Sequence, residues 1–353
     1  MAFLTVKNVS IRGVASCVPP KVEENVNLSI YKPGEAEEVI KSTGIERRHV
    51  VSDGIVASDL CLKACEKLLD QLNWDKESIN AICFVTETPD YINQPTGFVV
   101  HEKLGLNEDC VVLDLFHGCP GWVMGLSTMG CMMQTGMFKR VLLLVGDSTT
   151  AWTYATDRES QPLFGDCGTA TALEFDETAA PMYYHMGTRS SDGWAIVRKN
   201  GGERNPWTVE SLSKEMRLRS GELDVNGNAD IMDGMNVFSF GITVPPKSVK
   251  KLCDYAHVEL QSVDKIVLHQ ANKFMIQQIS KKLKVESEKV PVSLRDFGNT
   301  TSASIPLTIC SQCRKEYEAG EMHTVACTFG TGLSWATVYF ETKNIVCPDV
   351  IIY

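Results

Sequence analysis

The chain has 353 residues, which is too long for one ordinary hydrophobic core. Of these residues 44% are hydrophobic and 22% are charged, a balance typical of a globular enzyme. With 34 basic and 44 acidic residues its net charge is −10, which argues against the broad basic surface of a nucleic-acid-binding protein. No apolar run approaches the roughly 18 residues that span a bilayer, so we expect neither a nucleic-acid nor a membrane partner.

Short apolar runs alternate with stretches of helical spacing along the chain. The buried strands that we predict cover residues 11–19, 81–87, 111–116, 141–147, 169–175, 265–271, 290–294 and 324–330. Helices are predicted over 57–72, 121–137 and 247–257, where apolar residues recur every three or four positions. Strands that alternate with helices favour a layered α/β protein with buried sheets.

A weak internal repeat indicates two similar halves. Residues 78–90 parallel 262–273, residues 104–119 parallel 283–300, and residues 138–148 parallel 321–332. We therefore predict one half at 1–176 and a second at 177–353, with 177–235 as an excursion that covers the active site. Equivalent strand-end loops of two such halves meet across a pseudo-twofold axis, so residues far apart in the chain can share one pocket.

The N-terminal segment MAFLTVKNVSIRG has neither the basic region and long apolar run of an export signal nor its cleavage site. The 13 cysteines are therefore interpreted as free thiols in a cytoplasmic protein. The pairs Cys310 and Cys313, and Cys61 and Cys65, have no second pair of zinc ligands beside them, so no metal is expected.

The segment DLFHGCPGWVMGL places Cys119 between a buried strand and an apolar helical stretch. Pro120 suits the first turn of a helix, where its missing N–H is not needed. A thiol at a helix N-terminus is favoured as thiolate by the positive end of the helix dipole. Cys119 is thus a candidate nucleophile, and the alternative is a buried structural thiol like the other twelve cysteines.

Two polar side chains follow later apolar segments. His269 ends a very apolar strand in VLHQANK, and a neutral imidazole there can donate an N–H to a developing oxyanion. Asn299 lies in RDFGNTTSASIP, a Gly-Asn turn before a helix. Taken singly, a satisfied core histidine and a capping asparagine explain both residues. Together they form an uncharged pair suited to stabilising a carbanion beside a thioester.

The glycine-rich loop FGTGLSW, residues 329–335, follows a buried strand. We predict that the backbone N–H of Thr331 joins the N–H of Cys119 in an oxyanion hole. A plain tight turn is the alternative, because a lone Gly-x-Gly is weak evidence.

In this order, GCPG, HQAN, GNTTSAS and FGTGLSW resemble the motifs of the β-ketoacyl-[acyl-carrier-protein] synthase III group of thiolase-like enzymes. Further matches are TGIERRHV at 43–50, TDRESQPLFGDCGTATAL at 156–173 and DGMNVFSFGI at 233–242. The resemblance covers nearly the whole chain. It implies a five-layer αβαβα fold built from two duplicated halves, a homodimer, and no tightly bound cofactor.

The resemblance also implies roles for the site residues. Cys119 accepts an acyl group from a coenzyme A or acyl-carrier-protein thioester, and His269 with Asn299 promotes decarboxylation of a malonyl thioester, whose carbanion attacks the acyl-cysteine. This is a decarboxylative Claisen condensation of fatty-acid or related acyl and polyketide biosynthesis. Two other functions stay open here: transfer of the acyl group to an oxygen or nitrogen acceptor, and a non-catalytic subunit that supports a partner synthase.

The chain departs from the family pattern where the substrate carrier binds. Glu38 replaces the tryptophan that stacks on the adenine of coenzyme A, whereas Arg158 matches the arginine that supports the other face and is the predicted cofactor-binding residue. Phe274 replaces an arginine that helps to dock carrier protein, which leaves Lys273 as the predicted docking residue. Because Glu38 repels a phosphorylated nucleotide, we expect acyl-carrier protein to be a better donor than coenzyme A.

Overall fold

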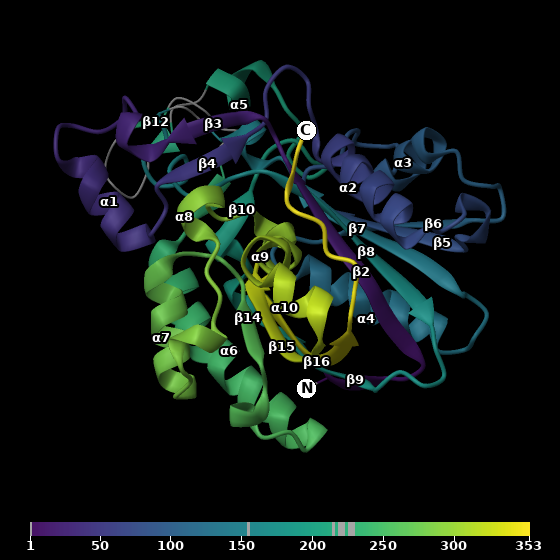
Figure 1. Ribbon diagram of the computed structural model, residues 1–353. Coiled ribbons are helices and arrows are strands. Elements are labelled where there is room, and N and C mark those ends of the chain that lie inside the picture. Colours follow the sequence, from purple (N-terminus) through teal and green to yellow (C-terminus); the bar gives the residue numbers. More distant parts are fainter. Residues whose placement is uncertain (1, 154–155, 214–215, 218–222, 225–229) are drawn as a thin grey trace.

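The computed structural model describes residues 2–153, 156–213, 216–217, 223–224 and 230–353, and arranges them in layers (Figure 1). Helices α2 (Ala57–Leu72) and α3 (Thr96–Leu104) cover the outer face of the first sheet. Between the two sheets lie α4 (Gly121–Met133), α9 (Ser304–Thr308) and α10 (Arg314–Ala319). Helices α6 (Gly234–Ala256) and α7 (Lys273–Leu283) complete the far side. The expected αβαβα architecture is confirmed.

The first sheet has the strand order β17-β2-β8-β7-β5-β6. Its strands are β17 (Ile351–Ile352), β2 (Val9–Val18), β8 (Cys167–Phe175), β7 (Arg140–Asp147), β5 (Ala81–Thr86) and β6 (Val111–Phe116). Strand β5 pairs in parallel with both β6 and β7. The carboxyl ends of these three strands therefore lie at one edge of the sheet, where the loops that follow them meet.

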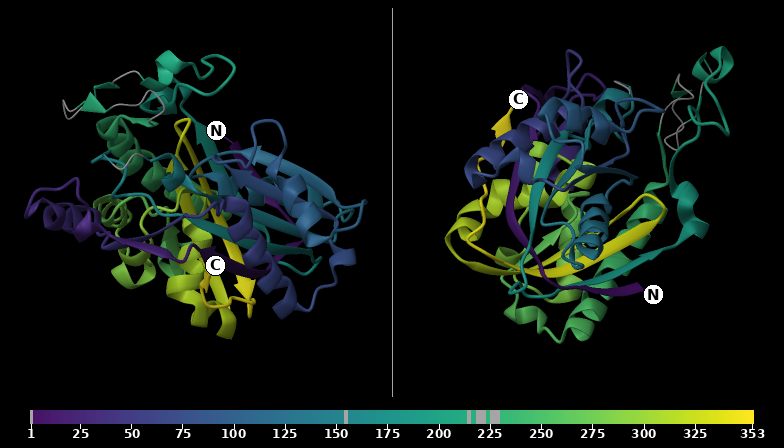
Figure 2. Two further views of the ribbon diagram at one scale, coloured as in Figure 1. Left: turned by 90° about the horizontal axis from the view of Figure 1, so that it is seen from above. Right: turned by 90° about the vertical axis from the view of Figure 1, so that its right-hand side faces the viewer.

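The second sheet has the order β1-β9-β16-β15-β14. Its strands are β1 (Ala2–Val6), β9 (Met182–Thr188), β16 (Ser334–Lys343), β15 (Glu321–Gly330) and β14 (Lys265–Leu268). Strand β1 joins this sheet and β17 joins the first, so the two chain ends lie at different sheets (Figure 2). The first sheet thus contains β17, which belongs to the predicted second half, and the second sheet contains β1, which belongs to the predicted first half. The division of the chain at 176/177 stays a prediction.

Smaller elements surround these layers. Two-stranded sheets are formed by β3 (Lys21–Glu24) with β4 (Arg47–Val50), by β10 (Ile196–Arg198) with β13 (Asp230–Met232), and by β11 (Met216–Arg217) with β12 (Leu223–Asp224). The remaining α-helices among the described residues are α1 (Glu35–Thr43), α5 (Val209–Ser213) and α8 (Leu294–Phe297). Helix α5 stands out from the layers (Figure 2).

Most predicted strands are present, but residues 290–294 do not form one. Residues 290–293 make a loop and Leu294 begins α8, because Pro291 has no N–H for a sheet ladder. The side chain of Gln270 substitutes for a neighbouring strand: it accepts the N–H of Ser293 at 3.0 Å and donates to the carbonyl of Leu268 at 2.7 Å.

The predicted excursion at 177–235 is also wrong in part, since it includes β9, which pairs on both sides within the second sheet. The predicted helix at 247–257 is the end of the longer α6, which continues through Pro245 and Pro246. The helix predicted over 121–137 ends at Met133.

Every residue of β5, and all but the first of β7, is buried. Between the sheets the indole of Trp122 is fully buried, and its N–H donates to the hydroxyl of Thr171 at 2.9 Å. The satisfied indole N–H removes the cost of burying this polar group. In the part of the chain that the structure describes, no helix is both long enough and apolar enough to cross a membrane.

Candidate active site

Cys119 lies in the turn between β6 and α4, at the carboxyl edge of the first sheet. Backbone bonds fix this turn: the N–H of His117 donates to the carbonyl of Thr86 at 3.4 Å, and the N–H of Gly121 donates to the carbonyl of Gly118 at 2.6 Å. The thiol therefore lies immediately before the first turn of α4, as predicted.

Gly330 ends β15 and brings the second sheet against the thiol of Cys119. A Cβ added to Gly330 would lie 2.7 Å from the Cβ and 2.8 Å from the Sγ of Cys119, so no side chain fits there. The N–H groups of Thr331 and of Cys119 itself donate toward the sulfur and act to lower the pKa of the thiol. The two backbone groups predicted for an oxyanion hole thus lie at the same thiol.

His269 follows β14 and has only 2% of its surface exposed. Its Nδ1 lies 2.8 Å from the hydroxyl of Ser304, and its ring packs edge-on against Phe329, with centroids 5.5 Å apart. Burial lowers the pKa of His269 to about 3. The imidazole is therefore neutral at physiological pH, as a hydrogen-bond donor to an oxyanion requires.

Asn299 is buried in the turn between α8 and the short helix η7 (Thr301–Ala303). Its backbone N–H donates to the carbonyl of Leu163 at 2.8 Å, and its carbonyl accepts the N–H of Gly165 at 3.1 Å. The side-chain oxygen accepts the N–H of Thr301 at 3.0 Å. This bond orients the carboxamide so that its NH₂ group can serve as the donor.

Direct contacts link the segments that carry the three candidates. Cys119 touches Gly330, and the adjacent Phe329 touches His269. The serine that pairs with His269 lies five residues after Asn299. The structure therefore brings together, around the partly buried residue Cys119, three loops that are widely separated in the sequence.

Asp147, at the end of β7, ties these loops to one another. It is fully buried, and its carboxylate accepts the hydroxyl of Thr86 at 3.0 Å and the N–H of Glu87 at 2.7 Å. The hydroxyls of Thr301 and Ser302 donate to its other oxygen. A single carboxylate thus holds the end of β5 against the loop that follows Asn299.

The environment of Cys119 opposes the thiolate that its place before α4 predicts. Burial is the largest influence, and the negative charges of Glu87 and Asp147 add to it, so the pKa of the thiol is well above its ordinary value. The donated N–H groups offset this only in part. The free enzyme therefore holds Cys119 as a neutral thiol.

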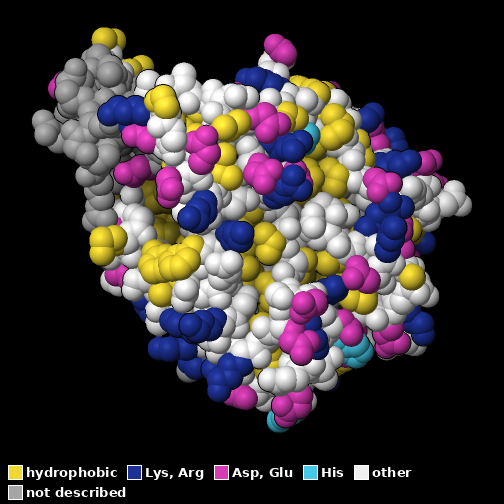
Figure 3. Space-filling view, turned by 60° about the vertical axis from the view of Figure 1, so that its left-hand side comes forward, with side chains coloured by type: hydrophobic (Ala, Val, Ile, Leu, Met, Phe, Trp, Pro, Cys, Tyr) yellow, Lys and Arg dark blue, Asp and Glu magenta, His cyan; other side chains and the backbone are white. Residues whose placement is uncertain are grey.

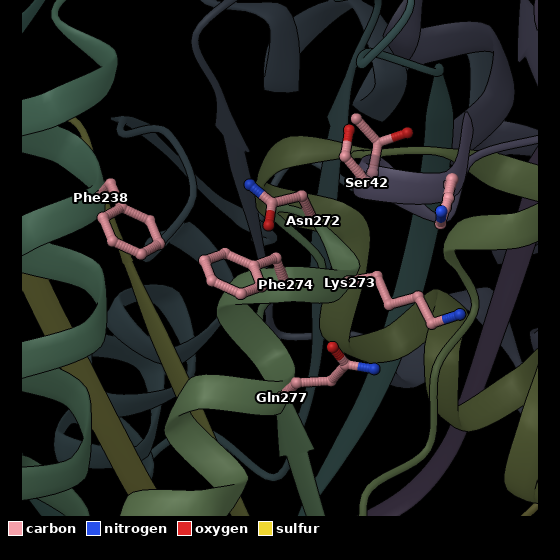
Figure 4. A pocket seen from close by; sticks show the side chains of 8 residues that line it. Ser42, Phe238, Asn272, Lys273, Phe274 and Gln277 are labelled. Carbon is pink, nitrogen blue, oxygen red and sulfur yellow. The ribbon is translucent and has the colours of Figure 1, made fainter. Parts of the chain in front are cut away.

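A surface hollow of about 350 Å³ lies between α1 and the start of α7. The rings of Phe238 and Phe274 stack along it, with centroids 5.6 Å apart and an angle of 8° (Figure 4). Asn272 lies above this stack and Lys273 beside it. On this side of the molecule, exposed hydrophobic side chains lie among both basic and acidic ones (Figure 3).

Arg158, the predicted cofactor-binding residue, is engaged within the protein. Its guanidinium forms an ion pair with Glu35, at the start of α1, and lies 5.5 Å from the ring centroid of Tyr31. Glu38 is exposed one turn further along the same helix. Helix α1 thus presents one carboxylate to the predicted cofactor-binding arginine and a second, exposed carboxylate one turn later.

Sequence reasoning missed Glu87, Asp147 and Ser304. A signal was present for the two carboxylates: each comes at the end of a very apolar strand, VTE after β5 and VGD in β7. Because carboxyl ends of parallel strands meet at one edge, such residues are expected beside the loop that carries Cys119. Ser304 had no comparable signal, since its contact depends on how α9 packs.

One possible metal-binding trio occurs among the described residues, formed by Glu321, His323 and Glu341. It lies at the opposite end of β15 from Gly330, so it has no part in the chemistry of the thiol. The Nδ1 of His323 is 2.8 Å from the hydroxyl of Tyr339.

Comparison with known proteins gives a consistent result. The chain matches the family model for 3-oxoacyl-[acyl-carrier-protein (ACP)] synthase III over residues 113–190 and the model for its C-terminal part over 253–342. It is 28% identical over 342 residues to the β-ketoacyl-[acyl-carrier-protein] synthase III of Desulfitobacterium hafniense, covering 96% of this chain and 99% of that protein.

Among solved structures, the 3-oxoacyl-(acyl-carrier protein) synthase of Burkholderia xenovorans matches with a TM-score of 0.92 and 33% identity, covering 100% of this chain and 99% of that one. A second structure, of a 3-oxoacyl-(acyl-carrier-protein) synthase III, matches with a TM-score of 0.88 and 29% identity, covering 94% and 99%.

Proposed function

Because this chain belongs to the 3-oxoacyl-[acyl-carrier-protein] synthase III family and is therefore a condensing acyltransferase, we propose that Cys119 carries the acyl group in its reaction. The observation that supports this role is the meeting of Gly330 and the N–H of Thr331 at the Cys119 thiol. A thioester carbonyl that the thiol attacks would place its oxygen between two backbone donors, which stabilise the tetrahedral intermediate.

In the second step, His269 and Asn299 stabilise the carbanion that forms when a malonyl thioester loses carbon dioxide. In the tautomer in which the hydroxyl of Ser304 donates to Nδ1, the proton of the neutral ring is on Nε2 and can be donated to the thioester oxygen. The NH₂ group of Asn299 supplies a second bond without adding charge. The carbanion then attacks the acyl-Cys119 carbonyl and releases the thiolate.

For the donor, we favour acyl-carrier protein over coenzyme A. Arg158 is already paired with Glu35, and Glu38 adds a further negative charge where a nucleotide would lie. The hollow at the start of α7 instead offers two stacked phenylalanines beside Lys273, a combination that suits an acidic carrier domain with some apolar surface. No tightly bound cofactor is needed, and the free cysteines suit a cytoplasmic location.

We further propose a homodimer that forms along β6. This strand was predicted to be buried, yet it lies at the edge of the first sheet, and among the described strands it pairs only with β5. Val111 is 39% exposed and Phe116 76% exposed. A bare apolar edge strand is an aggregation risk unless another strand pairs with it, and β6 of a second copy would extend the sheet across a twofold axis.

Intact-protein mass spectrometry after incubation with acyl thioesters tests the role of Cys119. We expect one acyl adduct on the wild type and none on Cys119→Ala, whereas His269→Ala should keep the adduct but form no condensation product with a malonyl thioester. Cys131→Ala serves as the control, because Cys131 is a partly exposed thiol on α4. An undiminished adduct on Cys119→Ala would refute the proposal.

A further inference from the structure

Glu87 is a carboxylate placed directly beside the nucleophile. It follows β5, and its carboxyl group packs on Gly118, the residue before Cys119: a Cβ added to Gly118 would lie 2.4 Å from its Cδ and from both of its oxygens. Any side chain at position 118 would thus displace the carboxylate. Glycine at this position permits that close approach.

The backbone of Glu87 is held firmly at this place. Its N–H donates to Asp147 at 2.7 Å, and the hydroxyl of the preceding Thr86 donates to the same oxygen at 3.0 Å. Thr88 accepts the N–H of Ser148 at 2.9 Å. The carboxylate therefore approaches Cys119 from a rigid strand end, which is the support that a catalytic group requires.

The site needs a group that exchanges protons with Cys119 and its substrate. The thiol must lose a proton when it is acylated and regain one when the product leaves. His269 accepts a proton poorly, since burial lowers its pKa to about 3, and the carboxamide of Asn299 is not a base. Asp147 is enclosed by hydroxyl and N–H donors. Glu87 acts electrostatically on the thiol and is only partly buried.

Building on the proposed function, we propose that Glu87 is a general base that removes an α-proton from an acyl thioester acceptor, so that this site also condenses acceptors without a carboxylate. The proton moves from the α-carbon to Glu87, and the enolate oxygen is held by His269 and Asn299. The α-carbon attacks the acyl-Cys119 carbonyl, the bond from that carbon to Sγ breaks, and Glu87 returns the proton to the thiolate. No carbon dioxide leaves and no redox partner is needed.

The position of Glu87 favours the same class of acceptor. An acceptor without a carboxylate of its own cannot form its carbanion by losing carbon dioxide, so it needs a base, and the Glu87 carboxylate beside Cys119 is placed to be one. The acceptor α-carbon must approach the acyl-Cys119 carbonyl to within roughly 3–3.5 Å to react, which brings its proton to the region where Glu87 lies.

Deuterium exchange tests the proposal on the full-length protein. Propionyl-pantetheine is incubated with wild type, Glu87→Gln, Glu87→Asp and Glu66→Gln in heavy water. Mass spectrometry follows deuterium at the α-carbon, the 3-oxoacyl product, and acylation of Cys119. We expect exchange and product with the wild type and with the control Glu66→Gln, which changes an exposed residue of α2. Glu87→Gln should slow both deuterium exchange and product formation about 100-fold, which is the usual contribution of a general base. Glu87→Asp should retain part of both activities.

The outcomes separate this inference from the proposed function. A wild type that acylates Cys119 and uses malonyl-pantetheine, but neither exchanges deuterium nor condenses propionyl-pantetheine, overturns the role of Glu87 and leaves the proposed function intact. Glu87→Gln that acylates and exchanges as fast as the wild type also overturns it. A wild type without any acylation of Cys119 overturns both.

Discussion

At the scale of single residues, burial decides the protonation states that the chemistry needs. His269 has a hydroxyl partner on one nitrogen and apolar surroundings, and burial lowers its pKa from the ordinary 6.5 to about 3. The same desolvation raises the pKa of the Cys119 thiol, because it disfavours a charge of either sign. The site is thus organised around neutral donors, with its charge on nearby carboxylates.

The low pKa of His269 has a consequence for stability in acid. Between about pH 6.5 and pH 3 the unfolded chain binds a proton at this histidine that the native protein does not, so the free energy of unfolding falls as the pH is lowered through this range, by about 1.4 kcal/mol per unit. His269→Gln removes this contribution. Between pH 6.5 and pH 4.5, the free energy of unfolding measured with urea should therefore fall by about 2 kcal/mol less in the variant than in the wild type.

The matched control for this measurement is His257→Asn, at the exposed C-terminal end of α6, because asparagine tolerates its positive φ of 56°. This variant should keep the acid sensitivity of the wild type. If the free energy of unfolding fell equally with pH in the wild type and in His269→Gln, the lowered pKa of His269 would be contradicted.

At the scale of elements, the site depends on strand ends locked together by side-chain bonds. Asp147 joins the end of β5 to η7 through hydroxyl and N–H donors from both. Helix α1 is joined to the segment of Arg158 by the ion pair of that arginine with Glu35. The first contact holds the end of β5 against the loop that follows Asn299, and the second is one that the proposed preference for acyl-carrier protein rests on.

Asp147→Ala should lower both stability and condensation. The change leaves several buried donors without an acceptor, and each costs about 1–3 kcal/mol, so urea unfolding should show a loss of about 3 kcal/mol or more. The loop of Asn299 would also lose its anchor, and condensation should fall more than acylation of Cys119. Asp70→Ala, at an exposed position of α2, is the control and should change neither.

Glu38→Trp should improve the use of coenzyme A donors. A tryptophan on this exposed turn of α1 could stack on adenine, and stacking of one base contributes about 1–3 kcal/mol. The kcat/KM for acyl-coenzyme A should rise about tenfold, while that for acyl-pantetheine, which has no adenine, stays the same. Glu37→Trp changes the neighbouring exposed residue and should give no gain. An equal gain with both donors would show that adenine is not the cause.

At the scale of the whole molecule, two sheets face a shared helical layer, and the chain ends cross between them (Figure 2). This arrangement brings the loops after β6, β14 and β15 to one place. It leaves β6 at an open edge, although its apolar sequence resembles that of the buried β5 and β7. The missing neighbour is the reason for proposing a second copy of the chain.

Phe116→Asp should convert the proposed dimer into monomers. Phe116 is 76% exposed in the single chain, so the change should hardly affect folding, but it would place a charge in the apolar contact that the proposed interface needs. Sedimentation velocity should show half the mass of the wild type. Val26→Asp replaces an exposed apolar residue of a distant short helix and should leave the mass unchanged.

Much of the fold followed from the sequence because an apolar run reports that its segment must be buried. The strands at 81–86 and 111–116 and the helix at 57–72 were predicted at or near their observed bounds. Cys119 and His269 were selected because each ends or follows such a segment, and Asn299 because it lies in a Gly-Asn turn before a helix. The family motifs then supplied the expected roles, which the mutations above test.

Tertiary structure alone decided the rest. Residues 290–294 look like a strand, yet a proline and the side chain of Gln270 make them a loop. Strand β6 looks buried, yet one of its sides has no neighbour within the described chain. The raised pKa of the Cys119 thiol could not be predicted from the sequence either, because it depends on burial by distant segments. The physical reason is that a local pattern records how strongly a segment avoids water, whereas charges and contacts depend on which distant segments fold against it.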